Sequence, residues 1–384
     1  NALTPNIDYL AQEGTLFENS YSHIPITLPS HASIFFSRFP HEIENYNNGQ
    51  KIKEYKEIPT LAEIFKQNDY STAAFVSLKT LKLHFGLGKG FDVYDDNFPE
   101  GRFYLSAGDI NNRVFPWLKS QGNSNFFLWV HYSDPHYPYA VPSLPSDLEI
   151  YLNDELVKEC ILYRYNNYEV NLNLKKGINK LRFEVNHEFI EDPKDNHIRF
   201  NKFDFSVHPD EKDIEIDFVE GFKTKGEGVY YRCKKQGLIE LINHAAPRQI
   251  QLAFRGKLNL RESGIRTRYK QEVEYMDDKI GDLWKELKEL ELFEKTRIAI
   301  VGDHGEGLGE YLNRKKQQDY GHVHFLYDIY LKVPLIFYDP HSSHRGDRIK
   351  EPATLVDISP TILNLMEFRD LPSFQGRDLF NLKR

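Results

Sequence analysis

Residues 297–307, RIAIVGDHGEG, decide the fold class of this chain. A continuous apolar run of strand length comes first, which is typical of a strand covered on both faces, and a glycine-rich polar turn follows it. Ligands of open α/β sheets bind beyond the carboxyl ends of such strands. We therefore expect an α/β domain with a site at Asp303 and His304, a carboxylate and an imidazole that suit a divalent metal ion. The alternative is that Asp303 caps the next helix beside a surface histidine.

Similar apolar runs of strand length occur on both sides of this stretch. Residues 71–76 (STAAFV), 126–130 (FFLWV) and 333–337 (VPLIF) are further apolar runs of strand length. Helical patterns alternate with them. Residues 60–63 (TLAE) form a capping box, and apolar side chains recur every three or four positions over residues 269–290. This alternation predicts an α/β fold, a mostly parallel sheet sandwiched by helices.

The middle of the chain has a different pattern. Residues 148–152 (LEIYL), 168–174 (YEVNLNL) and 181–185 (LRFEV) alternate apolar and polar side chains, and turn residues separate them. Short alternating strands of this kind predict an antiparallel β-sandwich. We therefore predict a discontinuous catalytic α/β domain that an inserted β-sandwich module interrupts. The predicted bounds are 1–145 and 266–384 for the α/β domain and 146–265 for the module.

Composition excludes several classes of protein. The chain has 384 residues, of which 40% are hydrophobic and 14% aromatic, enough to bury a core and to exclude general disorder. No apolar run approaches the roughly 18 residues of a transmembrane helix, so no membrane span is expected. A net charge of −8 argues against broad binding to nucleic acid. The chain starts at Asn1 without a leader-like segment, and the sequence leaves compartment and oligomeric state open.

A second polar cluster follows the apolar run at residues 126–130. Its sequence, HYSDPHYPY over residues 131–139, contains two histidines and one aspartate within six positions. Such side chains can bind a metal ion or an oxyanion. The alternative is a proline- and tyrosine-rich loop whose histidines only form hydrogen bonds.

Two further motifs are weak when taken alone. Residues 321–324 (GHVH) carry a histidine pair, and taken alone this pattern favours two solvated loop side chains. Residues 27–33 (TLPSHAS) place small hydroxyl side chains at the start of a helix, where capping is a sufficient role for Ser30. The amino end of a helix also stabilises anions, so Thr27 could attack a phosphorus or sulfur centre once a metal ion lowers its pKa.

Taken in order, these segments resemble the sulfatase branch of the alkaline-phosphatase superfamily. The opening TPNIDYLA at residues 4–11 is similar to that family's TPNxDxLA segment, and DPHYPY at residues 134–139 to its DPHxPY motif. GDHGE at residues 302–306, followed by GH at residues 321–322, matches its metal and substrate motifs. The resemblance covers most of the chain outside the β module.

The resemblance implies roles for single residues. Thr27 falls where the family has its nucleophile, and Asp303 and His304 fall on two metal ligands. His136 and His322 fall where the family places groups that contact the sulfate or phosphate and the leaving oxygen. Weaker candidates for substrate contact are His131, His324 and Lys332.

This chain departs from the sulfatase pattern at the nucleophile. Sulfatases proper carry a Cys that is modified to formylglycine where this chain has Thr27, and an Arg where it has His31. The Thr is similar to the nucleotide pyrophosphatase/phosphodiesterase branch, in which Thr attacks phosphorus directly. The implied divalent metal ion is Ca²⁺ if the site is sulfatase-like and Zn²⁺ or Mn²⁺ if it is phosphodiesterase-like, with Asp134 and His324 as ligands of any second ion. The family's first strand, with further Asp ligands, would precede residue 1.

We therefore predict a metal-dependent hydrolase that cleaves sulfate, phosphate or phosphonate esters through a covalent Thr27 intermediate. The expected substrate is a small molecule or a glycan ester, and no nucleic-acid partner is expected. Two alternatives stay open. One is a transferase of the same superfamily that passes a phospho-headgroup to a glycan or lipid. The other is an inactive glycan-binding or scaffold protein, whose β module would use its tyrosines for carbohydrate contact. Such tyrosines more often belong to core or cross-strand packing.

Overall fold

A computed structural model gives the fold of the chain. It describes residues 2–53, 58–99, 102–122, 124–137, 139, 148–160, 166–185, 197–206, 213–225, 228–259, 262–312, 316, 318–323, 325–369 and 371–381. The chain divides into two compact units. The first unit comprises Asn1–Pro135 and Lys270–Arg384, and the second unit comprises His136–Tyr269.

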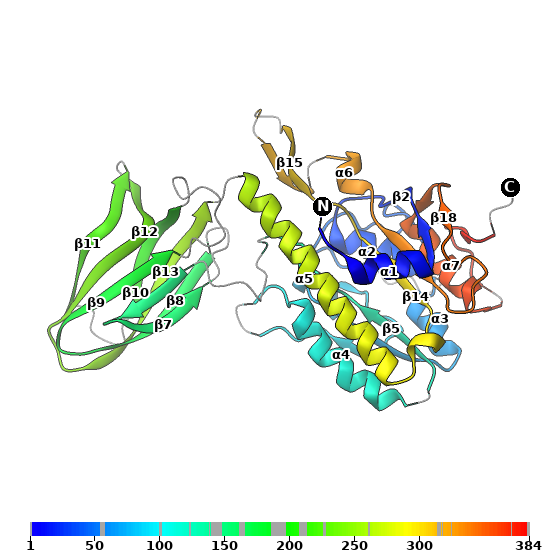
Figure 1. The fold of residues 1–384 in the computed structure, drawn as a ribbon, viewed down its shortest axis with the longest axis horizontal. Helices are drawn as coiled ribbons and strands as arrows, with labels where there is room; N and C mark the ends of the chain where they lie inside the picture. The colour runs from blue at the N-terminus through cyan, green and yellow to red at the C-terminus, as the bar shows by residue number, and fades with distance from the viewer. Residues whose placement is uncertain are drawn as a thin grey trace. The chain divides into compact units, whose positions relative to one another are not determined.

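Two sheets form the middle of the first unit (Figure 1). One is parallel, in the order β4-β3-β5, and consists of β3 (Ser71–Phe75), β4 (Val93–Asp95) and β5 (Phe126–Val130). The other is mixed, in the order β14-β17-β1-β18, and consists of β1 (Thr15–Phe17), β14 (Ile298–Val301), β17 (Leu335–Tyr338) and β18 (Arg348–Ile349). A two-residue ladder joins β2 (Ser20–Tyr21) to β19 (Ala353–Thr354). The predicted apolar runs are therefore strands.

Helices cover both faces of these sheets. On one side lie α1 (Pro5–Glu13), α4 (Ala107–Gln121) and α5 (Glu262–Glu289). On the other lie α2 (Thr27–Phe36), α3 (Leu61–Gln67) and α7 (Ile358–Leu365). The apolar cluster under the first set contains Phe75 of one sheet and Ile336 of the other, so the two sheets share one helical layer. This confirms the α/β class.

Local sequence signals account for the helix positions. α3 begins at the predicted capping box, in which Thr60 Oγ1 accepts the Glu63 N–H at 3.1 Å and the Glu63 carboxylate accepts the Thr60 N–H at 2.9 Å. The long periodic pattern is α5. Short 3₁₀ turns occur at Lys79–Leu81, Leu83–Phe85, Phe293–Lys295 and Leu355–Asp357. No helix in the described part of the chain is long and apolar enough to cross a membrane.

The prediction of a single mostly parallel sheet holds only in part. β14 pairs antiparallel with β17, and the parallel strands β3 to β5 form a sheet of their own. The pair is antiparallel because residues 302–334 leave and re-enter the sheet at the same end, without a helical crossover to the opposite end. Every residue of β5 and β14 remains partly exposed, whereas β17 is buried throughout. Among the described strands, the one before Asp303 is thus a half-buried strand at the edge of its sheet.

The excursion between β14 and β17 has its own structure. β15 (Gly307–Leu312) and β16 (Gln318–Gly321) pair as an antiparallel hairpin, and the short helix α6 (Asp328–Leu331) follows. The excursion closes where the Gly302 N–H donates to the Pro334 carbonyl at 3.1 Å.

The second unit is antiparallel, as predicted. Its strands are β6 (Leu148–Leu152), β7 (Glu155–Cys160), β8 (Asn166–Leu174), β9 (Gly177–Val185), β10 (His197–Ser206), β11 (Ile214–Lys225), β12 (Gly228–Asn243) and β13 (Arg248–Asn259). They form one hydrogen-bonded sheet in the order β7-β6-β9-β12-β10-β13-β8, with β11 beside β12. The predicted sandwich is therefore a single sheet, because the long β12 pairs with β10 along its first part and with β9 along its second. Strands of both halves share one core, which includes Leu172, Phe183 and Leu252.

Candidate active site

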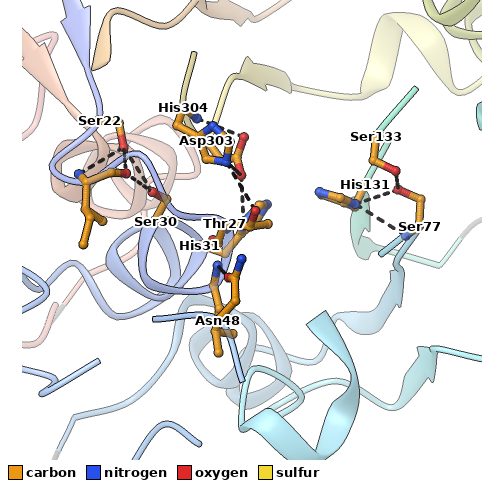
Figure 2. Close-up of polar contacts among 12 residues, drawn as sticks. Ser22, Thr27, Ser30, His31, Asn48, Ser77, His131, Ser133, Asp303 and His304 are labelled. Carbon is orange, nitrogen blue, oxygen red and sulfur yellow. Dashed lines mark hydrogen bonds and ion pairs between the residues drawn. The ribbon is translucent and has the colours of Figure 1, made fainter. Parts of the chain in front are cut away.

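The helix α2 carries the predicted nucleophile at its first residue. It begins at Thr27 after an extended Ile26, and all ten of its residues are buried. Ser30 is not the cap that the sequence suggested, since its hydroxyl lies inside the helix and donates to the Ile24 carbonyl at 2.7 Å. Asn48 serves the helix start instead, where its Oδ1 accepts the Leu28 N–H at 2.9 Å (Figure 2).

Thr27 faces the turn that follows β14. Its Oγ1 lies 3.3 Å from Nε2 of His304 (Figure 2). The other ring nitrogen, Nδ1, lies 2.9 Å from the Gly305 carbonyl, which can only accept. Nδ1 of His304 therefore carries the proton, and Nε2 presents its lone pair to the Thr27 hydroxyl. The predicted nucleophile and one predicted metal ligand thus lie in direct contact.

Asp303 lies next to the same pair. Its Oδ1 accepts the backbone N–H of His304 at 2.9 Å, and its Oδ2 lies 3.4 Å from His304 Nε2. Burial by itself would raise the pKa of this carboxyl, but the imidazoles of His304, His31 and His131 outweigh that effect and lower the pKa of Asp303 below its ordinary value. The group is therefore an anion at neutral pH.

His31 joins the group from the same helix as Thr27. Four residues separate them, which places both on one face of α2. The Nδ1–H of His31 donates to the Thr27 carbonyl at 2.8 Å and lies 3.7 Å from Asp303 Oδ2. Burial lowers the pKa of His31 below its ordinary value, against the opposing effect of the Asp303 carboxylate. Sequence reasoning did not name His31 as a site residue, although the four-residue spacing was an available signal.

His131 comes from the carboxyl end of the other sheet. It follows β5, and Ser77 follows the neighbouring parallel strand β3, so both lie at one sheet edge. The Ser77 hydroxyl lies 2.8 Å from His131 Nδ1 and donates to Ser133 Oγ at 2.7 Å (Figure 2). The His131 ring centroid is 5.0 Å from that of His31. These buried contacts hold His131 against the group around Asp303.

His322 reaches the site from the hairpin. It follows β16, whose Gly321 pairs with Gly307 at the start of β15. The His322 ring centroid lies 4.0 Å from that of His304. Its Nδ1 lies 2.6 Å from Oε2 of Glu306, to which the sequence motif assigned no role of its own.

Three further side chains were predicted to belong to the site. Lys332 ends α6, and its Nζ lies 3.4 Å from Asn19 Oδ1. His136 belongs to the second unit, and its Nδ1 lies 2.6 Å from the neighbouring Tyr137 carbonyl. His324 lies outside the described residues. The roles assigned to these three side chains stay predictions.

Asp134 has a structural task. Its two carboxylate oxygens accept the Ala107 N–H at the start of α4, at 3.0 and 3.1 Å. Burial raises the pKa of Asp134 to about 7. The structure uses it as a helix cap, which does not favour the suggested role as a ligand of a second metal ion.

The atoms around Thr27 fit a metal ion by spacing and by donor type. Oδ2 of Asp303 and Oγ1 of Thr27 lie 3.4 and 3.3 Å from His304 Nε2. Tetrahedral ligands at about 2.1 Å from a metal are roughly 3.4 Å apart. Mixed nitrogen and oxygen donors suit Zn²⁺ or Mn²⁺ better than Ca²⁺, which prefers oxygen. The described residues hold no group of three or more His, Cys, Asp or Glu arranged for a metal ion.

Comparisons with known proteins identify the family to which the chain belongs. A family model described as Sulfatase matches residues 1–368. The chain belongs to the sulfatase family. Its relatives in that family include iduronate 2-sulfatase of Homo sapiens, 23% identical over 88% of this chain and 55% of the relative. Another is the N-acetylglucosamine-6-O-sulfatase of Bacteroides thetaiotaomicron, 23% identical over 98% of this chain and 65% of the relative. Arylsulfatase K of Canis lupus familiaris is 22% identical over 94% of this chain and 58% of the relative.

The chain thus spans between 55% and 65% of the length of these relatives. Solved structures also resemble the sulfatase-family chain. The phosphonate monoester hydrolase of Agrobacterium radiobacter superimposes with a TM-score of 0.58 at 16% identity, over 99% of this chain and 72% of the other. The lipoteichoic acid synthase LtaP of Listeria monocytogenes does so with a TM-score of 0.56 at 16% identity, over 98% and 69%. At such identities the likeness shows a shared sulfatase-like α/β fold.

Proposed function

We propose that this sulfatase-family chain hydrolyses sulfate, phosphate or phosphonate esters with the Thr27 hydroxyl as nucleophile. The observation that carries the proposal is the 3.3 Å contact between Thr27 Oγ1 and His304 Nε2, beside the Asp303 carboxylate. Family membership supports ester hydrolysis as the reaction class. Because a Thr cannot become formylglycine, direct attack by the hydroxyl is the chemistry that Thr27 can supply, which favours phosphoesters and phosphonates.

Asp303, His304 and Thr27 would hold the divalent ion, which would lower the pKa of the Thr27 hydroxyl and neutralise charge on the ester oxygens. The Thr27 hydroxyl gives its proton to solvent, which returns one when Thr27 is released. The Thr27 oxygen forms a bond to the phosphorus or sulfur atom, while the bond to the alcohol oxygen breaks. His322 gives a proton to the departing alcohol oxygen. It then takes a proton from the water that attacks the adduct, which releases the acid and restores Thr27.

Other side chains of the site would bind the substrate oxygens. His131, fixed by the Ser77 hydroxyl at 2.8 Å, is the described candidate for a hydrogen bond to a non-bridging oxygen. Such preorganised donors are worth several kcal/mol in a site that excludes water. His136, His324 and Lys332 are proposed for the same task on the resemblance alone.

A hydrolysis panel tests the proposal. Aryl sulfate, phosphate monoester, phosphate diester and phosphonate substrates are assayed after chelation and after addition of Zn²⁺, Mn²⁺ or Ca²⁺. We expect turnover that needs a metal ion, is largest for a phosphoester or phosphonate, and is abolished in Thr27→Ala. A Thr27→Ala variant as active as the parent would contradict the nucleophile. Turnover that requires an added alcohol acceptor would identify the transferase alternative.

A further inference from the structure

We propose that Glu306 is a positioning residue that fixes the His322 ring for proton transfer to the leaving oxygen. The inference rests on the proposed function, because it assigns a partner to the histidine that serves the departing alcohol. It follows from the close approach of the two side chains and from the hairpin that enforces it. The sequence motifs contain both residues, but they assign no contact between Glu306 and His322.

The hairpin brings Glu306 and His322 together by its register. Gly307 pairs with Gly321, so the residues immediately before and after them leave the hairpin side by side. Both glycines are required. A Cβ on Gly307 would lie 2.6 Å from a Tyr330 ring carbon, and Gly321 has φ +95°, a left-handed conformation that other residues rarely adopt. The sequence thus places two glycines where the backbone must approach closely for the contact to form.

The contact itself is short and shielded from water. His322 Nδ1 and Glu306 Oε2 are 2.6 Å apart, and the two side chains are only 12% and 7% exposed. A carboxylate oxygen accepts, so Nδ1 is the donor and the ring cannot exchange its two nitrogens by rotation without losing this bond. The ring lies 4.0 Å from His304, the residue that contacts Thr27. Glu306 therefore determines which nitrogen of His322 is available for chemistry.

The hairpin has other contacts that hold its fold. The Tyr330 hydroxyl donates to Asp319 Oδ2 at 2.8 Å, and both side chains are buried. The Gly305 N–H donates to the Tyr330 carbonyl at 2.8 Å. These bonds lie in the same excursion, yet none of them includes His322. Tyr330→Phe is therefore a matched control that removes one buried hydrogen bond from the hairpin and leaves the histidine contact intact.

The test measures kcat and KM of the metal-loaded protein for esters whose leaving groups range from nitrophenol to a simple alkyl alcohol. Nitrophenolate departs without a proton, whereas an alkyl alcohol needs one. We expect Glu306→Ala to lower kcat for the alkyl ester by about 100-fold, the size of a general-acid effect, with little change for the nitrophenyl ester or in KM. Glu306→Gln keeps an acceptor oxygen and should restore part of the loss.

Three results would overturn the inference. They are an equal loss for all leaving groups, no loss in Glu306→Ala, or a Tyr330→Phe variant with the same leaving-group dependence. If Glu306→Ala fails to fold, Glu306→Gln and Tyr330→Phe still decide the matter, because a Gln variant that loses the same rate for every ester, or that shows the control's pattern, contradicts a positioning role. Failure of the proposed function is distinct, since the parent would then show no Thr27-dependent turnover at all.

Discussion

The two units bury polar side chains for different purposes. In the first unit, Thr27 and His31 are buried and Asp303 is partly buried. The polar atoms of Thr27 and Asp303 lie 3.3 to 3.7 Å from ring nitrogens of His304 and His31. In the second unit, Asn179 is completely buried and its amide is taken up by the backbone of a turn. Its Oδ1 accepts the Lys175 N–H at 2.9 Å, and its Nδ2 donates to the Lys175 carbonyl at 2.9 Å.

The different hydrogen-bond partners indicate different roles for the side chains around Thr27 and for the Asn179 amide. A buried amide that saturates backbone donors and acceptors stabilises the fold, because a lost partner would leave those groups unsatisfied. A hydroxyl, a carboxylate and imidazoles that converge at the carboxyl ends of strands keep hydrogen-bonding capacity for a ligand. Substitutions of Thr27, His31 or Asp303 should therefore change the rate of ester hydrolysis. Substitution of Asn179 should change the free energy of unfolding.

The largest expected effect is at Thr27. Thr27→Ala should lower kcat/KM by more than about 10³-fold, as for loss of other enzymatic nucleophiles. Its free energy of unfolding should change by only about 1 kcal/mol, because one weak hydrogen bond is lost. Ester hydrolysis and urea unfolding measure the two quantities. Ser30→Ala is the matched control, since it removes a buried hydroxyl from the same helix and should leave the rate unchanged; a comparable loss of rate there would break the comparison.

His23 is a buried polar side chain of the first unit whose expected effect is on stability. Its Nε2 is buried without a hydrogen-bond partner, and burial lowers the pKa of His23 to about 4. An unfolded histidine titrates near pH 6.5, so between about pH 6.5 and pH 4 only the unfolded chain takes up this proton. Stability contributed by the neutral ring is present above this window and is lost as pH falls through it, by roughly 3 kcal/mol.

The His23→Phe variant isolates this contribution. The new ring would stay beside Phe39, whose centroid is 4.8 Å from that of His23. Relative to the parent, the variant should gain roughly 3 kcal/mol of unfolding free energy when the pH falls from about 7 to about 4. Urea unfolding of both proteins at the two pH values measures the gain. Parallel pH dependences would show that His23 is not the titrating group.

Asn179 provides the opposite case in the second unit. Asn179→Ala should lower the unfolding free energy by about 2 kcal/mol, because the Lys175 and Gly177 backbone groups lose the partner that the buried amide provides. It should leave kcat for a small ester unchanged. Denaturant unfolding followed by a probe in the second unit, together with the hydrolysis assay, measures both. A variant that is stable but slow would place the β module in the reaction.

Ser77 should give the smallest effect. Ser77→Ala removes the hydroxyl that contacts His131 Nδ1. We expect KM, or the inhibition constant of inorganic phosphate, to rise by roughly tenfold, which corresponds to the loss of one hydrogen bond to a charged group. Thermal unfolding of the same variant controls for a loss of fold. An unchanged inhibition constant would show that His131 does not contact the substrate oxygens.

Much of this fold could be predicted because apolar runs and capping boxes are local signals. The strands at 71–75 and 126–130 and the start of α3 were all evident from the sequence. The relative direction of paired strands could not be predicted, because an apolar run has the same pattern in a parallel and in an antiparallel pair. The antiparallel pairing of β14 with β17 depends on the path of the residues that connect them.

Some residues of the candidate site could be predicted from local motifs, and others could not. Thr27, Asp303 and His304 carry recognisable motifs, and the structure brings them together. Glu306 meets His322 only through the hairpin register, and Ser77 meets His131 only through parallel pairing of two strands far apart in the chain. Long-range pairing of this kind leaves no periodic signal in a single sequence. A serine after a strand is also too common to be singled out.

The central claim is that Thr27 attacks the ester. The most direct test is mass spectrometry of the protein quenched during turnover of a slow phosphoester, phosphonate or sulfate ester. The account predicts an added phosphoryl, phosphonyl or sulfuryl group on the peptide that contains Thr27, which disappears when substrate is exhausted and never forms in Thr27→Ala. Turnover with the adduct on another residue, or undiminished turnover in Thr27→Ala, would contradict it.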